Sequence, residues 1–445
     1  MYEKAHGPFF HEFEAFDDDR RTVFWRKRLA DLVAHSRAKA PFYGERLGGY
    51  DAGAEHPLSN VPTMGASDLR TAVPPGGRSL LTSESTGFTV FQSGGTTGVP
   101  KTTLFTHTEL EEINQLNGRG FYATGLLPSD RVGNFWAVGG LYMTFIHMNR
   151  MLQQYGNMNF PFSNHTPSDF VYNVANLFKI NCFSGIASVV LNTLREIEAQ
   201  GHHLATGFGV EKVYYGGEHL YEADRKELRE KFGVKTILAP GYGTVDTWYI
   251  GYQCTETPAG VFHAHEDQCY SEIFNEDETR HCNLGEVGML YATPLVRFLT
   301  PVIRYRVGDK ARWLGGECAC GRKTRRFELL GRGDDVLRIG YDSVDYNGVQ
   351  EVALKIPGLS GSIQMEKRRE EGKDRLVIRI ESPAPAENFA GLAENFEQEF
   401  LSLRPSFREF VKKGSVWPLA VDILPLGTLE RNSRTGKLIR VKDVV

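Results

Sequence analysis

The chain has 445 residues, of which 41% are hydrophobic and 24% are charged. This composition is typical of a globular protein with more than one core, and it excludes a disordered chain. The formal net charge of -4 offers no basic field to nucleic acid, and no segment has the apolar length of a membrane span. The N-terminus lacks the pattern of a signal peptide, so we expect a cytoplasmic protein without nucleic acid or membrane as a partner.

The first segment in chain order, residues 24–47, is predicted to form a helix followed by a turn at Ala40-Pro41. From about Phe88 to Gly331, short apolar runs alternate with amphipathic segments, and this alternation predicts α/β layers with a largely parallel sheet. Most runs end near Gly or Ser, and open α/β sheets bind ligands at the carboxyl ends of their strands. The strand-like runs are FTVFQS, VGNFWAV, INCFSG, VEKVYYGG and TILAPGYG.

The run SGGTTGVPK at Ser93–Lys101 is typical of a loop that holds phosphate. Its glycines and hydroxyls let an anionic oxygen approach the backbone N–H groups closely. A predicted strand at Gly87–Phe91 precedes it and a predicted helix at His107–Gly120 follows it. The spacing excludes the P-loop of NTPases, because two residues separate Gly98 from Lys101. The alternative for this run is a flexible linker.

A composition typical of a hinge, LGRGDD, separates the α/β part from a smaller region. We therefore expect two domains, residues 1–331 and residues 332–445, the second being a small α+β domain. Its predicted elements are a helix near 348–355, strands near 360–366 and 375–380, a helix at 387–402 and a last strand near 419–424.

Four further compact runs lie downstream of the Gly-rich loop. They are YYGGEH at 214–219, PGYGTVD at 240–246, YRVGD at 305–309 and RTGKLIR at 434–440. With SGGTTGVPK and GRGDD, these runs follow the order and approximate spacing of the adenylate-forming acyl ligases. Over nearly its full length the chain resembles the phenylacetate-CoA ligase branch of that superfamily.

The resemblance implies a large layered N-terminal domain that binds AMP and the acyl group, and a mobile C-terminal domain. It implies ATP-dependent, Mg²⁺-dependent activation of a small carboxylic acid, of aryl or small aromatic type, to acyl-AMP, followed by transfer to CoA. The alternatives are an enzyme that loads a carrier protein or another acceptor, and a nucleotide-binding homologue without turnover. The oligomeric state is open, with a homodimer as one alternative.

The resemblance also implies roles for individual residues. Lys437 matches the lysine that reaches the α-phosphate and the carboxylate, and Asp334 matches the pivot between the half-reactions. Asp309 matches the carboxylate that binds the ribose hydroxyls, with Arg332 as a further contact. Asp246 stands where the family has a glutamate that holds Mg²⁺, so its side chain is one methylene shorter.

The remaining nucleotide contacts implied by the resemblance fall into two groups. The phosphate group consists of Ser93, Gly94, Gly95, Thr96, Thr97, Gly98 and the more replaceable Lys101. The adenine group consists of Gly216, Gly217, Glu218, Tyr242, Gly243 and Thr244, and Tyr242 has an acyl-pocket role as its alternative. Phe135, Trp136, Tyr142 and Tyr215 lie near motifs that line the acyl pocket in relatives and favour a flat aromatic acid, although plain core is the alternative.

Cysteine spacing predicts a second metal site. Six cysteines are too few for a disulfide scaffold. Cys318 and Cys320 lie in a glycine-flanked turn, and with Cys254 and His263 they supply the three sulfurs and one imidazole of a structural Zn²⁺ site. Scattered free thiols are the alternative. The competing ligands are Cys269, Cys282, His265 and His281.

Overall fold

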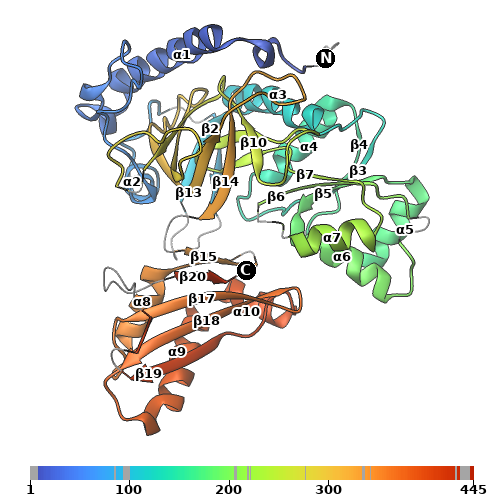
Figure 1. Cartoon of the computed structure of the whole chain (residues 1–445), viewed down its shortest axis with the longest axis vertical. Coiled ribbons are helices and arrows are strands. Elements are labelled where there is room, and N and C mark those ends of the chain that lie inside the picture. Colours follow the sequence, from blue (N-terminus) through green and yellow to red (C-terminus); the bar gives the residue numbers. More distant parts are fainter. Residues whose placement is uncertain are drawn as a thin grey trace. The chain divides into compact units, whose positions relative to one another are not determined.

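The computed structural model divides the chain into two compact units (Figure 1). The larger unit contains the described residues of Met1–Ser93 and Lys101–Gly331, and the smaller contains those of Arg332–Val445. Among the described residues, no helix combines the length and the apolar composition that crossing a bilayer requires. The described residues are 9–84, 87–93, 101–204, 208–217, 220, 222–275, 277–332, 336–340, 342–425, 428–430 and 441–444.

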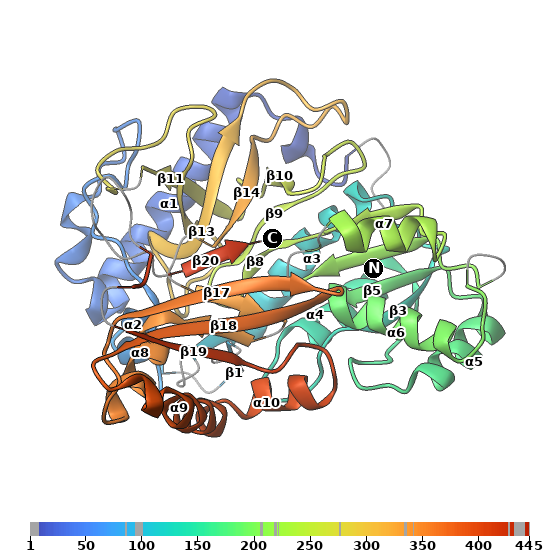
Figure 2. The ribbon, with the colours of Figure 1, turned by 60° about the horizontal axis from the view of Figure 1, so that its bottom comes forward.

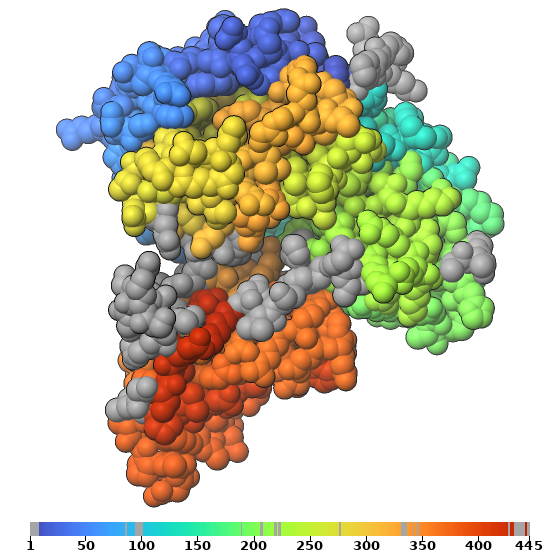
Figure 3. Space-filling view, viewed as in Figure 1, coloured from blue at the N-terminus to red at the C-terminus, as the bar shows by residue number. Residues whose placement is uncertain are grey.

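The larger unit begins with helices that cover part of its surface, drawn in blue in Figure 3. They are η1 (Glu12–Ala15), α1 (Asp18–Lys39), η2 (Pro41–Tyr43), η3 (Arg46–Gly49) and α2 (Ala66–Ala72). Asp17 caps α1, because its side chain accepts a hydrogen bond from the Arg20 N–H at 2.9 Å. The predicted helix is confirmed, and it ends at Lys39 because Ala40 precedes a proline and adopts an extended conformation.

A five-stranded parallel sheet occupies one half of the larger unit, in the order β4-β3-β5-β6-β7. Four of its strands come from the predicted apolar runs, so the α/β prediction is confirmed here. In Figure 1, α6 and α7 lie on one side of this sheet and α3 and α4 toward the other. The elements are α3 (His107–Ala123), β3 (Arg131–Phe135), α4 (Thr144–Tyr155), β4 (Met158–Phe160), α5 (Ser168–Phe178), β5 (Cys182–Ile186), α6 (Ala187–Ala199), β6 (Lys212–Gly216), α7 (Glu222–Glu230) and β7 (Thr236–Leu238).

The second half is a seven-stranded sheet in the order β11-β12-β13-β14-β10-β9-β8, whose registered neighbours pair antiparallel. The prediction of a largely parallel sheet is wrong for this half. A separate antiparallel hairpin, β1 (Phe88–Gln92) and β2 (Thr102–Thr106), leads into α3. The seven strands are β8 (Tyr242–Thr244), β9 (Trp248–Tyr252), β10 (Val261–Ala264), β11 (Cys269–Phe274), β12 (Gly288–Pro294), β13 (Tyr305–Leu314) and β14 (Arg326–Arg332).

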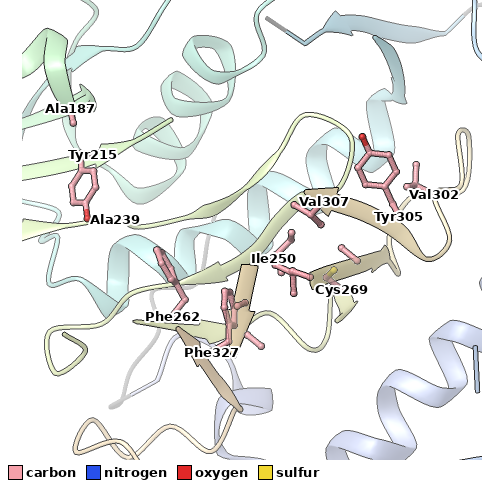
Figure 4. Close-up of a cluster of buried hydrophobic side chains, with 14 of the residues drawn as sticks. Ala187, Tyr215, Ala239, Ile250, Phe262, Cys269, Val302, Tyr305, Val307 and Phe327 are labelled. Carbon is pink, nitrogen blue, oxygen red and sulfur yellow. The ribbon is translucent and has the colours of Figure 1, made fainter. Parts of the chain in front are cut away.

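One hydrophobic core runs through both halves of the larger unit. Figure 4 shows part of it, with Ile250, Val307 and Cys269 grouped between strands of the antiparallel sheet. Tyr305 lies at the edge of this group, and its hydroxyl points away from Cys269. The core therefore fixes the ring of Tyr305 and leaves its polar end for other contacts.

The smaller unit has its own core and a four-stranded sheet in the order β19-β18-β17-β20. In Figure 2, β17, β18 and β19 lie side by side, with α9 along β19. The α+β prediction is confirmed, but the strand expected to be last is followed by β20. The elements are β15 (Val336–Ile339), β16 (Asp342–Asp345), α8 (Tyr346–Lys355), β17 (Ile363–Glu370), β18 (Lys373–Ser382), η4 (Ala386–Asn388), α9 (Phe389–Leu403), α10 (Pro405–Lys412), β19 (Ala420–Pro425) and β20 (Val441–Val444).

Candidate active site

The carboxyl ends of the parallel strands bring two predicted site regions together. Trp136 directly follows β3, Gly216 ends β6, and Gly217 has a φ of 78°. A Cβ atom on Gly216 would lie 2.9 Å from Cη2 of Trp136, so the indole lies against bare backbone. Position 216 therefore requires glycine, and a flat ring lies beside the predicted adenine wall.

Tyr242 and Asp309 are joined across the antiparallel sheet. The Tyr242 hydroxyl lies 2.5 Å from Oδ2 of the buried Asp309. Three strands separate β8 from β13 in the sheet order. In a flat sheet this would place them roughly 19 Å apart. The sheet must curve strongly, and the curvature brings together two residues that the motifs assign to the nucleotide.

Lys101, Asp246 and Tyr305 form a second contact group. The Lys101 ammonium pairs with Oδ2 of Asp246 and donates to the Tyr305 hydroxyl at 2.9 Å. The Tyr305 hydroxyl in turn donates to Asp246 Oδ2 at 3.0 Å. Lys101 directly precedes β2, Asp246 lies in the turn between β8 and β9, and Tyr305 is the first residue of β13. Tyr305 was not predicted as a site residue, although it opens the YRVGD run.

The main chain at Asp246 is held from both sides. Its N–H donates to Thr244 Oγ1 at 3.2 Å, and its carbonyl accepts a hydrogen bond from the buried Arg297. Arg297 also donates to Thr103 Oγ1 at 2.6 Å, which links the turn to β2. Burial lowers the pKa of Arg297 to about 10, against the attraction of Glu109 and Asp246, so it stays charged at neutral pH. The surrounding sequence, PLVRFLTP, gave no signal for this residue.

The second carboxylate oxygen of Asp246, Oδ1, is buried and has no hydrogen-bond partner among the described residues. Burying a carboxylate oxygen without a hydrogen-bond donor or a cation beside it costs free energy. Hard divalent cations prefer such oxygen ligands. The surroundings of Asp246 therefore fit the predicted Mg²⁺.

Ser93 and Lys101 close the base of the predicted phosphate loop. The Ser93 N–H donates to the Lys101 carbonyl at 2.9 Å, and the Lys101 N–H donates to Ser93 Oγ at 3.0 Å. Gly243 is also sterically required, because a Cβ there would lie 1.9 Å from the Trp248 carbonyl oxygen. The predicted residues outside the described part of the chain are Gly94, Gly95, Thr96, Thr97, Gly98, Glu218, Asp334, Lys437 and the side chain of Arg332.

The four predicted acyl-pocket residues have different surroundings. Phe135 packs in the core, with ring centroids 4.7 Å from Phe183 and 5.2 Å from Phe162. The Tyr215 hydroxyl accepts a hydrogen bond from Arg225. Tyr142 is exposed, and Trp136 donates its indole N–H to Ser184 Oγ at 3.1 Å. Trp136 is thus the member of this set that contacts another predicted site residue, Gly216.

A buried polar pair next to the Asp246 turn was not predicted. The His147 ring lies edge-on to Trp248, with centroids 4.4 Å apart, and its Nδ1 contacts Oδ1 of Asn114. Burial, followed by repulsion from Arg150, lowers the pKa of His147 to about 3, so the imidazole is neutral. Trp248 adopts a φ of 63°, a left-handed conformation that is unfavourable for a bulky side chain.

The predicted cysteine and histidine ligands converge in the larger unit. The ligand atoms of Cys254, His263, Cys318 and Cys320 all lie within 4.8 Å of one another. His263 Nε2 lies 3.5 Å from the Cys254 sulfur and 3.4 Å from the Cys320 sulfur, and the Cys254 and Cys318 sulfurs are 3.7 Å apart. A tetrahedral Zn²⁺ with ordinary bond lengths requires edges of about 3.6 Å for N–S and about 3.8 Å for S–S.

Polar contacts also surround this cluster. His263 Nδ1 lies 3.1 Å from Thr324 Oγ1, a contact of the kind that orients a ligating imidazole. Arg322, two residues after Cys320, donates to the buried Glu14 at 2.6 Å, and Tyr252 donates to the same carboxylate at 3.0 Å. The turn that carries two of the sulfurs is thus bound to the N-terminal segment.

No family model matches the chain. It is 26% identical to the phenylacetate-coenzyme A ligase of Thermus thermophilus over 449 residues, covering 97% of this chain and 98% of the relative. It is also 26% identical to the phenylacetate-coenzyme A ligase of Escherichia coli, covering 82% of this chain and 83% of that relative. An indoleacetate–lysine synthetase of Pseudomonas savastanoi is 24% identical and covers 50% of this chain and 52% of the relative.

Among solved structures, 2-hydroxyisobutyryl-CoA ligase with 2-HIB-AMP and CoA matches with a TM-score of 0.80 and 20% identity. The match covers 100% of this chain and 95% of the solved chain. It confirms the predicted fold, that of the adenylate-forming enzymes. Over most of its length the chain is similar in sequence to phenylacetate-CoA ligases, as its motifs predicted.

Proposed function

We propose that the protein activates a carboxylic acid with ATP and transfers the acyl group to CoA. The observation that carries this proposal is the convergence, in one unit, of Tyr242 with Asp309 and of Lys101 with Asp246. The similarity to phenylacetate-CoA ligases and to a solved CoA ligase supports the same class of enzyme, an AMP-forming acid–thiol ligase.

In the first half-reaction a carboxylate oxygen attacks the α-phosphorus of ATP, the bond to the β-phosphate breaks, and pyrophosphate leaves. Negative charge collects on the transferred group and must be neutralised. Lys101 at the base of the loop and Lys437 from the RTGK run supply cationic groups for this charge. In the second half-reaction the CoA thiol attacks the acyl carbon, and AMP leaves.

The nucleotide is held by residues with separate tasks. Asp309 accepts the ribose hydroxyls, and the backbone of Gly216 and Gly217, beside the Trp136 indole, forms the adenine wall. Asp246 would hold Mg²⁺ through its carboxylate. When bound, this ion neutralises phosphate charge and orients the leaving pyrophosphate.

We infer an aryl or small aromatic acid as the substrate, because Trp136 offers a flat apolar surface beside Gly216. The relatives at 26% identity are named for phenylacetate.

The chain keeps six free cysteines. This fits the expected cytoplasmic location, where ATP and CoA are available.

Cys254, His263, Cys318 and Cys320 would hold a structural Zn²⁺. The donor set is closed, with four protein ligands, and the sulfur and nitrogen separations fit a tetrahedron. A closed site has no position for a substrate, so its role is to stabilise the larger unit.

A second candidate acceptor follows from one comparison. The indoleacetate–lysine synthetase that matches half of the chain is named for an amine acceptor. Transfer of the acyl group to an amine, or to the thiol of a carrier protein, would use the same acyl-AMP. The acyl acceptor therefore has alternatives to CoA, namely an amine and the thiol of a carrier protein. The remaining alternative to an enzyme is a nucleotide-binding homologue without turnover.

The test is pyrophosphate release by the purified full chain with a panel of arylacetic, benzoic and short aliphatic acids. Each acid is assayed with ATP and Mg²⁺ alone, with CoA, and with lysine in place of CoA. Acid-dependent release that CoA accelerates supports the proposal, and acceleration by lysine alone supports the amine acceptor. Nucleotide binding without release for any acid would contradict both.

A further inference from the structure

The ammonium group of Lys101 stands where the proposed function requires a metal ion. Its partner Asp246 is 1% exposed, while the Lys101 side chain is 18% exposed. One carboxylate oxygen of Asp246 receives both Lys101 and the Tyr305 hydroxyl. The other oxygen, Oδ1, has no hydrogen-bond partner in the described part of the chain.

This arrangement leaves the carboxylate neutralised but incompletely coordinated. A buried carboxylate without a counter-charge is unfavourable, so the pair with Lys101 stabilises the protein before nucleotide arrives. A divalent cation at the same oxygens would lie a few ångströms from the ammonium and be repelled by it. Lys101 and a divalent cation therefore compete for Asp246.

We propose that Lys101 is a resident cation that keeps divalent metal away from Asp246 until ATP binds. The inference rests on the proposed function and deepens it, because it sets an order of events at the same site. Lys101 is the last residue of the predicted phosphate loop, so the phosphates of ATP offer its ammonium a stronger anionic partner. When Lys101 moves to the phosphates, it no longer pairs with Asp246, whose carboxylate would then be able to hold the metal ion.

Tyr305 is the positioning residue in this exchange. Its ring is packed at the edge of the core (Figure 4). Its hydroxyl contacts both Lys101 and Asp246. A hydroxyl can donate to the carboxylate in either state, since it carries no charge. It therefore holds the carboxylate orientation while the cation beside it changes.

The prediction is tested with Mn²⁺ as the probe, by titration calorimetry and electron paramagnetic resonance of the full chain without nucleotide. Wild-type protein should bind Mn²⁺ weakly at this site. Lys101→Met should bind one Mn²⁺ with a dissociation constant lowered by about tenfold or more, because a charge pair at this depth has a large interaction energy. The double variant Lys101→Met, Asp246→Asn should lose that binding.

Lys212 provides a matched control. It pairs with the buried Asp130 at 2.7 Å, and the two side chains are 17% and 4% exposed. Lys212→Met also removes the lysine partner of a buried aspartate in the larger unit. It should not create a Mn²⁺ site, because Asp130 keeps hydrogen bonds from the Leu127 N–H and from Asn181. Tight binding by both variants would show that any freed carboxylate collects metal, and would overturn the proposal.

Equal Mn²⁺ affinity of wild type and Lys101→Met would also overturn it. If Lys101→Met does not fold, as judged by circular dichroism, Lys101→Gln replaces it, because the amide is neutral and can still bond Asp246 and Tyr305. The titrations contain neither acid nor ATP. Absence of pyrophosphate release would therefore contradict the proposed function without affecting the Mn²⁺ result. A negative Mn²⁺ result would contradict the role of Lys101 without affecting the proposed function.

Discussion

Asp246 is the residue at which this chain departs from the motif that it resembles, and we infer that its surroundings compensate for the shorter side chain. Arg297 and Thr244 hold its main chain on both sides. The carboxylate therefore has little freedom apart from its own rotation. Because Lys101 and Tyr305 reach it from β2 and β13, the site is assembled around the aspartate.

Lys437 is predicted to serve adenylation without contributing to stability. It lies outside the described residues, and its assignment rests on the RTGK run. Lys437→Ala should reduce acid-dependent pyrophosphate release by about 10²-fold or more, the scale of one lost contact to transition-state charge. The melting temperature should not change. Release at the wild-type rate would exclude the assignment.

Glu272 is predicted to make the stability of the larger unit depend on pH. Burial raises the pKa of Glu272 to about 7, against the attraction of Arg304 3.7 Å away. The unfolded chain releases this proton near pH 4.5, whereas the folded chain keeps it until about pH 7. The folded state binds more protons in this window, so the unfolding free energy falls as pH rises through it.

Glu272→Gln should remove this slope and raise the unfolding free energy at pH 8 by about 3 kcal/mol. Denaturant unfolding at pH 5, 6, 7 and 8 measures it. Glu256→Gln, at an exposed position of the same unit, is the control and should keep the wild-type slope. A parallel slope in Glu272→Gln would show that other groups carry the pH dependence.

At the scale of elements, the sequence predicted the strands whose ends carry chemistry. The runs before Trp136, Gly216 and Gly241 became β3, β6 and β7, because each is a short apolar run bounded by turn residues. The antiparallel sheet was missed because β11 and β12 are buried along their whole length. Without alternation of apolar and polar residues, neither strand carries a period-two signal.

The sequence also did not predict the side-chain contacts that depend on the curvature of the sheet or on long-range packing. Nothing in the spacing of Tyr242 and Asp309 indicates a hydrogen bond between them, since the curvature of the sheet creates it. Arg297 lies in an apolar run without a motif, and Tyr305 opens the YRVGD run, in which only Asp309 was predicted as a site residue. The four zinc-ligand candidates were found because cysteine and histidine are rare enough for their spacing to be informative.

The contact between α3 and the turn after β7 gives a test at this scale. A Cβ on Gly120 would lie 1.7 Å from the Pro240 carbonyl oxygen, whereas one on Gly118 would lie 2.8 Å from the Phe10 ring. Gly120→Ala should cost about 1–3 kcal/mol despite its helix-propensity gain of about 1 kcal/mol, and it should weaken ATP binding through Tyr242.

Gly118→Ala is the matched control on the same helix, because the Phe10 side chain can turn aside. It should be neutral or stabilising. Chemical denaturation and a nucleotide-binding titration measure both effects. Similar losses of stability and ATP affinity in the two variants would contradict the prediction. They would show that α3 tolerates no Gly→Ala substitution, whether or not the glycine lies close to Pro240.

The cysteine cluster is predicted to contain about one Zn²⁺ per chain in protein prepared without chelator. Removing the metal should lower the melting temperature more than it lowers ATP affinity, because the cluster ties β10 to the 318–322 turn and to Glu14. Elemental analysis decides the first point. Cys318→Ser with Cys320→Ser should abolish zinc, while Cys282→Ser, outside the cluster, should retain it.

At the scale of the whole molecule, the proposed chemistry draws on both units. The described residues that we propose to contact the nucleotide belong to the larger unit, whereas Lys437 belongs to the sequence of the smaller one. Each unit has its own hydrophobic core, so each can move as a body without losing its packing. The two half-reactions can therefore use different arrangements of the same two units.

The boundary between the units makes this idea testable through Asp334, which lies outside the described residues in the GRGDD run. Asp334→Pro fixes φ at about -65° and should hinder a rotation of the smaller unit. Pyrophosphate release with acid and ATP should persist, while thioester formation from preformed acyl-AMP and CoA should fall by about tenfold or more, as expected when a conformational step becomes limiting. Asp334→Ala keeps the backbone free and serves as the control, with both half-reactions near the wild-type rate. Equal losses of the two half-reactions in Asp334→Pro would show that the residue supports the fold or the nucleotide site, because a pivot is needed only for the passage from one half-reaction to the other.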